Sequence, residues 1–211
     1  MRRIIALLLI AMLAFAVAAC DNSTVLGFGQ TQSKFQVGAI SGNTYSNPFL
    51  GVSCTTDDDW TYYTAQETAE LNNLVADYLP EDYAKIYETA DTFVDMCVAS
   101  DDGSCNINVS AEKLTALQSK TFDAETTFRS MFSNYKETYE NMGYTNCEFD
   151  IQKVVVAGKD FDGCCCTANL KGITLYQKQI AFVKNNYAVM VTVTSFNRDL
   201  SDELFEFISF I

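Results

Sequence analysis

The chain has no histidine among its 211 residues. Histidine is the usual general base near neutral pH, a frequent zinc ligand and a member of most nucleophile–base triads. Its absence excludes every histidine-based triad and leaves carboxylate or cysteine chemistry as the routes to catalysis. The sequence therefore favours a protein that is not an enzyme.

Basic residues are also scarce. The chain has 14 Lys and Arg against 27 Asp and Glu, which gives a formal net charge of −13 at pH 7. Binding of nucleic acid needs clustered basic side chains that neutralise phosphates, and electrostatic adhesion to anionic lipid needs them too. We therefore expect no nucleic-acid partner and no membrane contact through charge, and we interpret the acidity as a source of solubility.

The N-terminus has the layout of a secretory signal. Arg2 and Arg3 precede an uninterrupted apolar run from Ile4 to Val17, and small residues follow it up to Cys20. The run is too short, and has the wrong flanks, for a retained spanning helix. Residues 17–20 (VAAC) resemble a bacterial lipobox, which implies that the Cys20 thiol receives a diacylglyceryl group and that the chain is cut before it. Two acyl chains on one cysteine give stable anchoring.

The rest of the chain divides by composition. Residues 21–44 are rich in Ser, Thr, Gln, Asn and Gly and predict a flexible tether. Residues 45–211 are enough for one domain, and the 48% of apolar residues in the chain indicates a globular protein. We therefore predict a signal peptide over 1–20 that includes the lipidated cysteine, a tether over 21–44 and a single α+β domain over 45–211.

Three helices are predicted from apolar residues at helical spacing and from stop and start signals. The first runs from Thr64 to Pro80, with Glu81–Thr89 as a further short turn. The second is capped by Asp123 and ends at Gly143. The third is capped by Ser201 and continues to Ile211.

Strands are predicted from alternating apolar residues and turn signals. Short runs occur at Phe49–Thr55 and Trp60–Tyr63, and a hairpin is expected where Phe93–Ala99 and Asn106–Val109 flank a turn. Four consecutive strands follow the second helix, and the last of them, Tyr187–Ser195, is predicted to be central and covered on both faces. The resulting order, β–α–ββ–α–ββββ–α, is typical of α+β architecture with a mostly antiparallel sheet.

Seven cysteines follow Cys20, and none is arranged as C-x-x-C. Cys164-Cys165-Cys166 lies in a predicted strand, so Cys164 and Cys166 should face one way and Cys165 the other. With Cys147 as a third sulfur, Cys164 and Cys166 could bind a soft metal such as copper or zinc. The alternatives are thiol-redox chemistry, structural disulfides, or small apolar side chains inside a covered sheet.

The order of elements, with particular residues, resembles the Mog1/PsbP-like fold over residues 45–211. The residues that carry the resemblance are Tyr45-Ser46-Asn47, Phe49, Gly51-Val52, Trp60, residues 156–159 (VAGK), the Gly172–Thr194 hairpin and the closing Leu204–Ile211 helix. The resemblance implies a three-layer α/β/α sandwich whose members mostly dock onto protein partners and are not known for catalysis.

Together these features predict a lipid-anchored protein on the extracytoplasmic face of the cell membrane, held by Cys20. We expect its domain to be a non-enzymatic binding or assembly module for an unidentified protein or small-molecule partner, with no cofactor. The alternative is a thiol-redox or soft-metal protein that uses the Cys164–Cys166 cluster.

Overall fold

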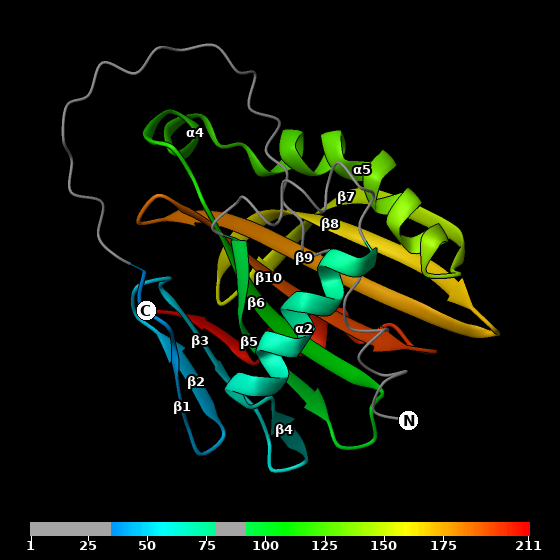
Figure 1. The fold of residues 1–211 in the computed structure, drawn as a ribbon, viewed down its shortest axis with the longest axis horizontal. Coiled ribbons are helices and arrows are strands. Elements are labelled where there is room, and N and C mark those ends of the chain that lie inside the picture. The colour runs from blue at the N-terminus through cyan, green and yellow to red at the C-terminus, as the bar shows by residue number, and fades with distance from the viewer. Residues whose placement is uncertain (1–34, 79–91) are drawn as a thin grey trace.

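The structure, a computed structural model, describes residues 35–78 and 92–211, and it describes the side chains of α2 only up to Asn72 (Figure 1). Within these residues the strands are antiparallel and form two sheets. The large sheet has seven strands in the order β4-β5-β6-β10-β9-β8-β7, and the small sheet has four in the order β1-β2-β3-β11. The further short turn predicted over Glu81–Thr89 lies outside the described residues.

The bounds of the elements are as follows. The large sheet consists of β4 (Trp60–Tyr62), β5 (Thr92–Ser100), β6 (Cys105–Lys113), β7 (Thr145–Val156), β8 (Lys159–Leu170), β9 (Ile173–Lys184) and β10 (Tyr187–Phe196). The small sheet consists of β1 (Ala39–Ser41), β2 (Thr44–Asn47), β3 (Val52–Thr55) and β11 (Ile208–Phe210). The helices are α2 (Ala65–Tyr78), α4 (Ala116–Thr121), α5 (Ala124–Asn141) and α6 (Ser201–Phe205).

The four long strands after α5 form a continuous meander, as the alternation of apolar residues predicts. The turn between β9 and β10 is made by Asn185 and Asn186, whose φ angles of 52° and 61° suit the amide side chains of asparagine. β10 lies between β6 and β9, and every residue from Tyr187 to Ser195 is buried. The predicted central position of this strand is confirmed.

The two faces of the large sheet contribute to two separate hydrophobic cores. On one face Val189, Val191 and Val193 of β10 pack with Tyr45 and Val52 of the small sheet. On the other face Met190, Leu175, Cys164 and Cys166 pack against α5. Alternation along each strand supplies both cores from one sheet, because successive side chains point to opposite faces.

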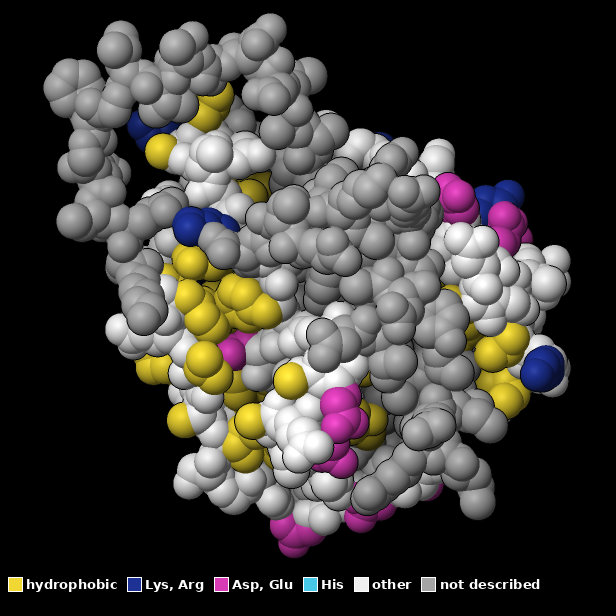
Figure 2. Space-filling view, viewed as in Figure 1, with side chains coloured by type: hydrophobic (Ala, Val, Ile, Leu, Met, Phe, Trp, Pro, Cys, Tyr) yellow, Lys and Arg dark blue, Asp and Glu magenta, His cyan; other side chains and the backbone are white. Residues whose placement is uncertain are grey.

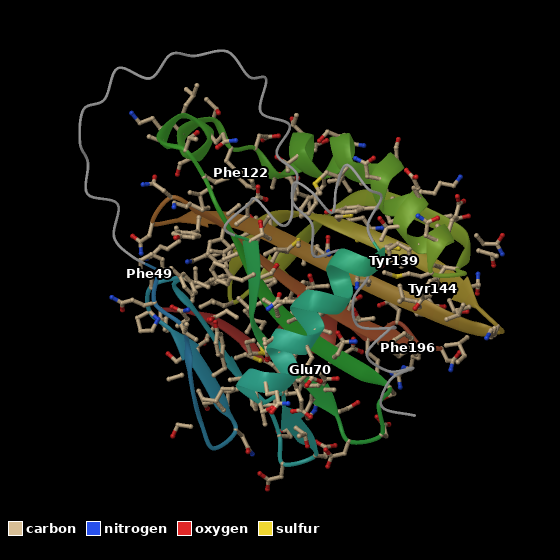
Figure 3. All side chains as sticks on the ribbon, in the orientation of Figure 1. Phe49, Glu70, Phe122, Tyr139, Tyr144 and Phe196 are labelled. Atoms are coloured by element: carbon tan, nitrogen blue, oxygen red, sulfur yellow. The ribbon has the colours of Figure 1, made fainter. Side chains whose placement is uncertain are left out.

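Helix α5 follows the sequence prediction closely. The Asp123 carboxylate accepts a 2.8 Å hydrogen bond from Thr126 N and caps the helix. Its buried residues are Phe128, Met131, Tyr135, Thr138 and Tyr139. Tyr139 and Tyr144 lie near the end of α5, with ring centroids 5.1 Å apart (Figure 3). The face of α5 that packs on the sheet is therefore a stripe of methionine and aromatic side chains.

Helix α2 begins where the sequence predicts, at a reciprocal cap. Thr64 N donates to the Glu67 carboxylate at 2.9 Å, and Glu67 N donates to Thr64 Oγ1 at 3.2 Å. The helix packs on β5, where Asn72 Oδ1 accepts a 2.9 Å hydrogen bond from Val94 N. The predicted hairpin is also confirmed, since β5 pairs with β6.

The predicted α/β/α sandwich is wrong. One face of the large sheet is covered by α5, but the other is covered mainly by the small sheet, so the architecture is that of a β-sandwich with added helices (Figure 1). β3 and β4, which follow one another in the sequence, belong to different sheets. The small sheet could not be predicted from the sequence as a second layer, because its strands are only three or four residues long and one of them, β11, lies near the C-terminal end of the sequence.

The predicted C-terminal helix is also wrong beyond its first turn. α6 ends at Phe205, and Ile208–Phe210 forms β11, which pairs antiparallel with β3. Ser201 is not the cap, because the cap position is Leu200 and it makes no side-chain hydrogen bond to the helix. Pairing with β3 outweighs the helical spacing of these residues, because the pair completes the small sheet over the core.

Candidate ligand-binding recess

The structure places the three predicted metal-site cysteines in one core. Cys164 and Cys166 of β8 point toward α5 and are buried, and Cys147 of β7 packs against the same cluster. Cys165 lies on the opposite face of the strand, as alternation predicts, and is partly exposed. All seven cysteines of the described residues are free thiols.

This environment keeps the thiols protonated. Burial raises the pKa of Cys164 and of Cys166 above the ordinary thiol value, and it raises the pKa of Cys165 to about 11. The thiolate is the nucleophile and the metal ligand, so these groups are poorly suited to either role at neutral pH. Within residues 35–78 and 92–211, no group of three His, Cys, Asp or Glu side chains is placed to hold a metal ion.

Cys20, the predicted lipidation site, lies outside the described residues. In the part of the chain that the structure describes, no helix combines the length and apolar character needed to cross a membrane.

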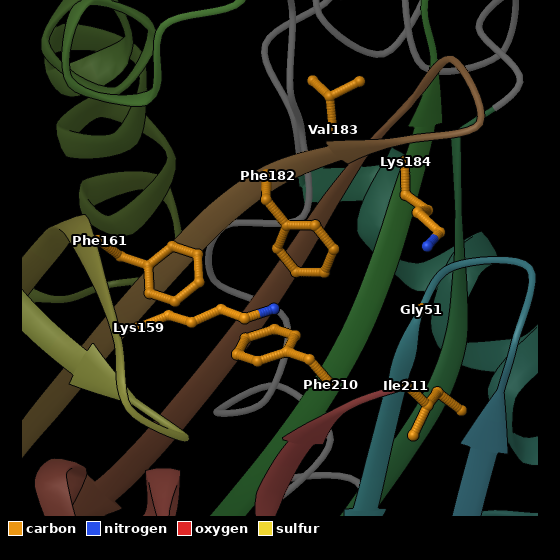
Figure 4. A pocket seen from close by; sticks show the side chains of 8 residues that line it. All are labelled: Gly51, Lys159, Phe161, Phe182, Val183, Lys184, Phe210 and Ile211. Atoms are coloured by element: carbon orange, nitrogen blue, oxygen red, sulfur yellow. The ribbon is translucent and has the colours of Figure 1, made fainter.

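A different site emerges at one corner of the sandwich. A recess of about 330 Å³ lies where the start of β8 and the end of β9 meet β11 (Figure 4). The lining residues come from four segments that are distant in the sequence: Gly51, Lys159, Phe161, Phe182, Val183, Lys184, Phe210 and Ile211. The recess is open to solvent on one side, since its lining side chains are only half-buried or exposed.

Three phenylalanines form the apolar wall of the recess. The Phe210 ring lies 5.5 Å from the Phe161 ring and 5.4 Å from the Phe182 ring, centroid to centroid, with the second pair edge to face. Phe161 and Phe182 lie 6.3 Å apart. Such spacings are typical of favourable aromatic contacts, so the three rings hold one another in place. They nevertheless remain half-buried, which leaves apolar surface for a ligand.

Two lysines border this wall. The Lys159 ammonium lies 4.5 Å from the centroid of the Phe210 ring, within the range of a cation–π contact. Figure 4 shows the Lys159 side chain extended between Phe161 and Phe210, while Lys184 enters from the other side. Among the described residues, neither lysine forms an ion pair with a carboxylate.

Gly51 gives Lys184 its position. The φ of Gly51 is +74°, and a Cβ built on it would lie 3.2 Å from Lys184 Cε and 3.3 Å from the backbone oxygen of Ile211. The same glycine accepts a 3.1 Å hydrogen bond from Ile211 N through its carbonyl group. A glycine is required here both for the backbone conformation and for the close approach of the lysine.

A second hollow, of about 540 Å³, is acidic. Its lining includes Asp57, Asp101 and Glu203, and the rings of Trp60 and Phe207 meet in it edge to face at 5.4 Å. Figure 2 shows acidic side chains gathered at the lower edge of the molecule, below β4. Backbone and side-chain hydrogen bonds from Ser104 and Ser100 lower the pKa of Asp102 at its rim. This hollow is an acidic surface, and none of the described side chains that line it has a buried polar atom without a hydrogen-bond partner.

Sequence reasoning missed the recess. Gly51 and the residues 156–159 were singled out only for their resemblance to a fold that the structure does not have. Each of the three phenylalanines, Phe161, Phe182 and Phe210, lies in an apolar run that is typical of buried core residues. No local pattern indicates that they meet at an open corner of the sandwich. The pairing of β8 with β9 brings Phe161 and Phe182 together, and the pairing of β11 with β3 adds Phe210.

Comparison with known proteins gives little guidance. No protein-family model matches the sequence, and no curated protein matches it. A crystal structure of a protein from Bacteroides thetaiotaomicron VPI-5482 is similar, with a TM-score of 0.45 and 12% sequence identity. The match covers 82% of this chain and 49% of that one, so this chain spans about half the length of the other protein.

Proposed function

We propose that this protein is an exported lipoprotein, anchored by a lipid on Cys20, whose domain binds a ligand in the recess walled by Phe161, Phe182 and Phe210. The domain acts as a binding module and not as an enzyme. Its ligand is delivered from the extracytoplasmic side, where the anchor places the domain.

The anchor is supported by the order of features at the N-terminus. Arg2 and Arg3, the apolar run and the lipobox-like residues 17–20 follow one another with the spacing of a lipoprotein signal. The strong net negative charge leaves acyl chains, and not electrostatics, as the means of membrane contact.

The single observation that supports binding is the open aromatic recess. Ligand pockets are typically concave, mostly apolar and about 300–1,000 Å³ in volume, with a few polar groups that fix orientation. The recess has a volume of about 330 Å³, three aromatic rings and two amino groups. The rings are held by their mutual contacts, so the site is formed before any ligand arrives.

A non-enzymatic role is supported by the available chemistry. The chain offers no histidine as a base. The thiols of Cys164 and Cys166 are buried among apolar side chains, where their raised pKa values disfavour the reactive thiolate. These observations also weaken the alternative of a thiol-redox or soft-metal protein.

The test is to isolate the lipoprotein from native membranes and analyse the small molecules released when it is denatured. A Phe182→Leu variant removes one ring of the recess wall, and Phe132→Leu is the matched control. Phe132 is also half-buried and stacks on Phe149 at 5.7 Å, but it lies on the α5 side of the large sheet. We expect a compound that is retained by the wild type and Phe132→Leu and lost from Phe182→Leu. Identical extracts from all three proteins would contradict the proposal.

A further inference from the structure

We infer that the recess selects a small organic anion, such as a carboxylate with one ring or a short chain as its apolar body. This inference rests on the proposed function, because it assigns the ligand chemistry of the same recess.

Among the described residues, Lys159 and Lys184 have no carboxylate partner; Lys120 and Lys171 have none either, but they do not border the recess. Elsewhere in the described residues, Lys178 pairs with Asp202 at 2.7 Å, Lys153 with Asp162 at 2.5 Å and Arg129 with Glu125 at 2.9 Å. Lys159 and Lys184 border an open recess instead, and their charge is available to a ligand.

The geometry assigns different roles to the two amino groups. Lys159 lies over Phe210, so a carboxylate that meets its ammonium also brings an attached ring or chain onto the aromatic wall (Figure 4). Lys184 lies beside Gly51, and among the described residues it makes no cation–π contact with the aromatic wall. We therefore expect Lys159 to contribute more to anion binding than Lys184.

The same arrangement disfavours other classes of ligand. A cationic ligand would place a second positive charge beside Lys159, on an aromatic face that the lysine already covers. A neutral apolar ligand would gain from the rings but nothing from the two ammonium groups. The volume of about 330 Å³ is at the small end of ligand sites, which suits one ring or a short chain.

The experiment compares phenylacetate with phenylacetamide, which have the same shape but differ in charge. Binding to the lipidated full-length mature protein in detergent is measured by isothermal titration calorimetry, with titration into detergent alone subtracted. We expect phenylacetate to bind up to about fivefold more tightly than phenylacetamide, since a partly exposed ion pair contributes up to about 1 kcal/mol.

Three variants distinguish the possible outcomes. Lys159→Gln should weaken phenylacetate binding about fivefold and leave phenylacetamide binding unchanged, Lys184→Gln should have a smaller effect, and Lys120→Gln, an exposed lysine of α4, should have none. Equal binding of the two probes, unaffected by Lys159→Gln but weakened by Phe182→Leu, would overturn the anion assignment and leave the recess as a binding site. Binding that Phe182→Leu does not change, or no binding of either probe, would overturn the recess itself.

Discussion

The Tyr45 hydroxyl donates a 2.6 Å hydrogen bond to Oδ2 of Asp95, and this contact joins the small sheet to the large one. Asp95 occupies a β-bulge in β5, since Val94 pairs with Ser110 and Met96 with Val109 while Asp95 has no partner across the strands. A bulge re-aims a side chain, and here it turns a carboxylate toward the small sheet. Asn47 Nδ2 at 2.7 Å and Gly38 N at 3.0 Å also donate to it.

Asp95→Asn should destabilise the sandwich strongly. The substituted amide places a donor against groups that already donate, and a hydrogen bond to a charged group contributes about 1.5–3 kcal/mol. We expect the free energy of unfolding, measured by urea denaturation, to fall by about 2–4 kcal/mol. Glu140→Gln, which removes only the exposed pair with Lys136, should cost less than about 0.5 kcal/mol. A loss for Asp95→Asn as small as that of the control would contradict the joining role of this contact.

Stability should decline in alkaline solution. Burial raises the pKa of Cys54 and of Cys97 to about 12, and it also raises the pKa of Tyr45. Above about pH 9 the unfolded chain releases thiol protons that the folded chain retains, so the free energy of unfolding falls as the pH rises. Each such thiol contributes about 1.4 kcal/mol per pH unit to this slope.

The measurement is urea denaturation under reducing conditions at about pH 8 and about pH 10, on either side of the ordinary thiol pKa. Cys97→Ala should show a shallower decline, by the contribution of about one thiol, whatever its absolute stability. Equal stability at the two pH values would show that the thiols are accessible in the folded protein.

Gly51 and Gly158 allow backbone strain to be separated from crowding. Both have φ = +74°, but a Cβ at Gly158 meets nothing within 4 Å, whereas one at Gly51 lies 3.2 Å from Lys184 Cε. Gly158→Ala should therefore cost about 1 kcal/mol of stability for strain alone, and Gly51→Ala should cost about 1 kcal/mol more. Thermal unfolding of the two variants checks this, and equal losses would mean that Lys184 is free to move away.

The sequence was sufficient to predict the parts of the fold that are long and local. Alternation over ten to twelve residues in β7–β10, together with the Asn185-Asn186 turn, specifies the meander and its faces. The cap at Asp123 specifies where α5 begins, and the spacing of apolar residues along α5 specifies its buried face. In both cases the signal lies within one contiguous run of the chain.

What could not be predicted depends on distant partners. The spacing of Leu204, Ile208 and Ile211 suits a helix, but Ile208 pairs with Cys54, more than a hundred residues away in the sequence. The bulge that turns Asp95 exists only in the register between β5 and β6. The recess depends on the same β3–β11 pairing, so nothing local to Phe161 or Lys159 reveals it.

Replacing Cys20 by serine should release the protein from membranes. A hydroxyl at this position does not accept the lipid, and no charge attraction to anionic lipid remains to hold so acidic a domain. After fractionation we expect the wild type in the membrane pellet and Cys20→Ser either in the soluble fraction or uncut. A Cys20→Ser protein that is processed and still fully membrane-bound would contradict anchoring through this thiol.

Mass spectrometry of the N-terminal peptide of the native protein tests the central claim most directly. The account predicts a chain that begins at Cys20 and carries a diacylglyceryl group on its sulfur. A native peptide that runs unbroken through residues 17–20 with an unmodified Cys20 would contradict it.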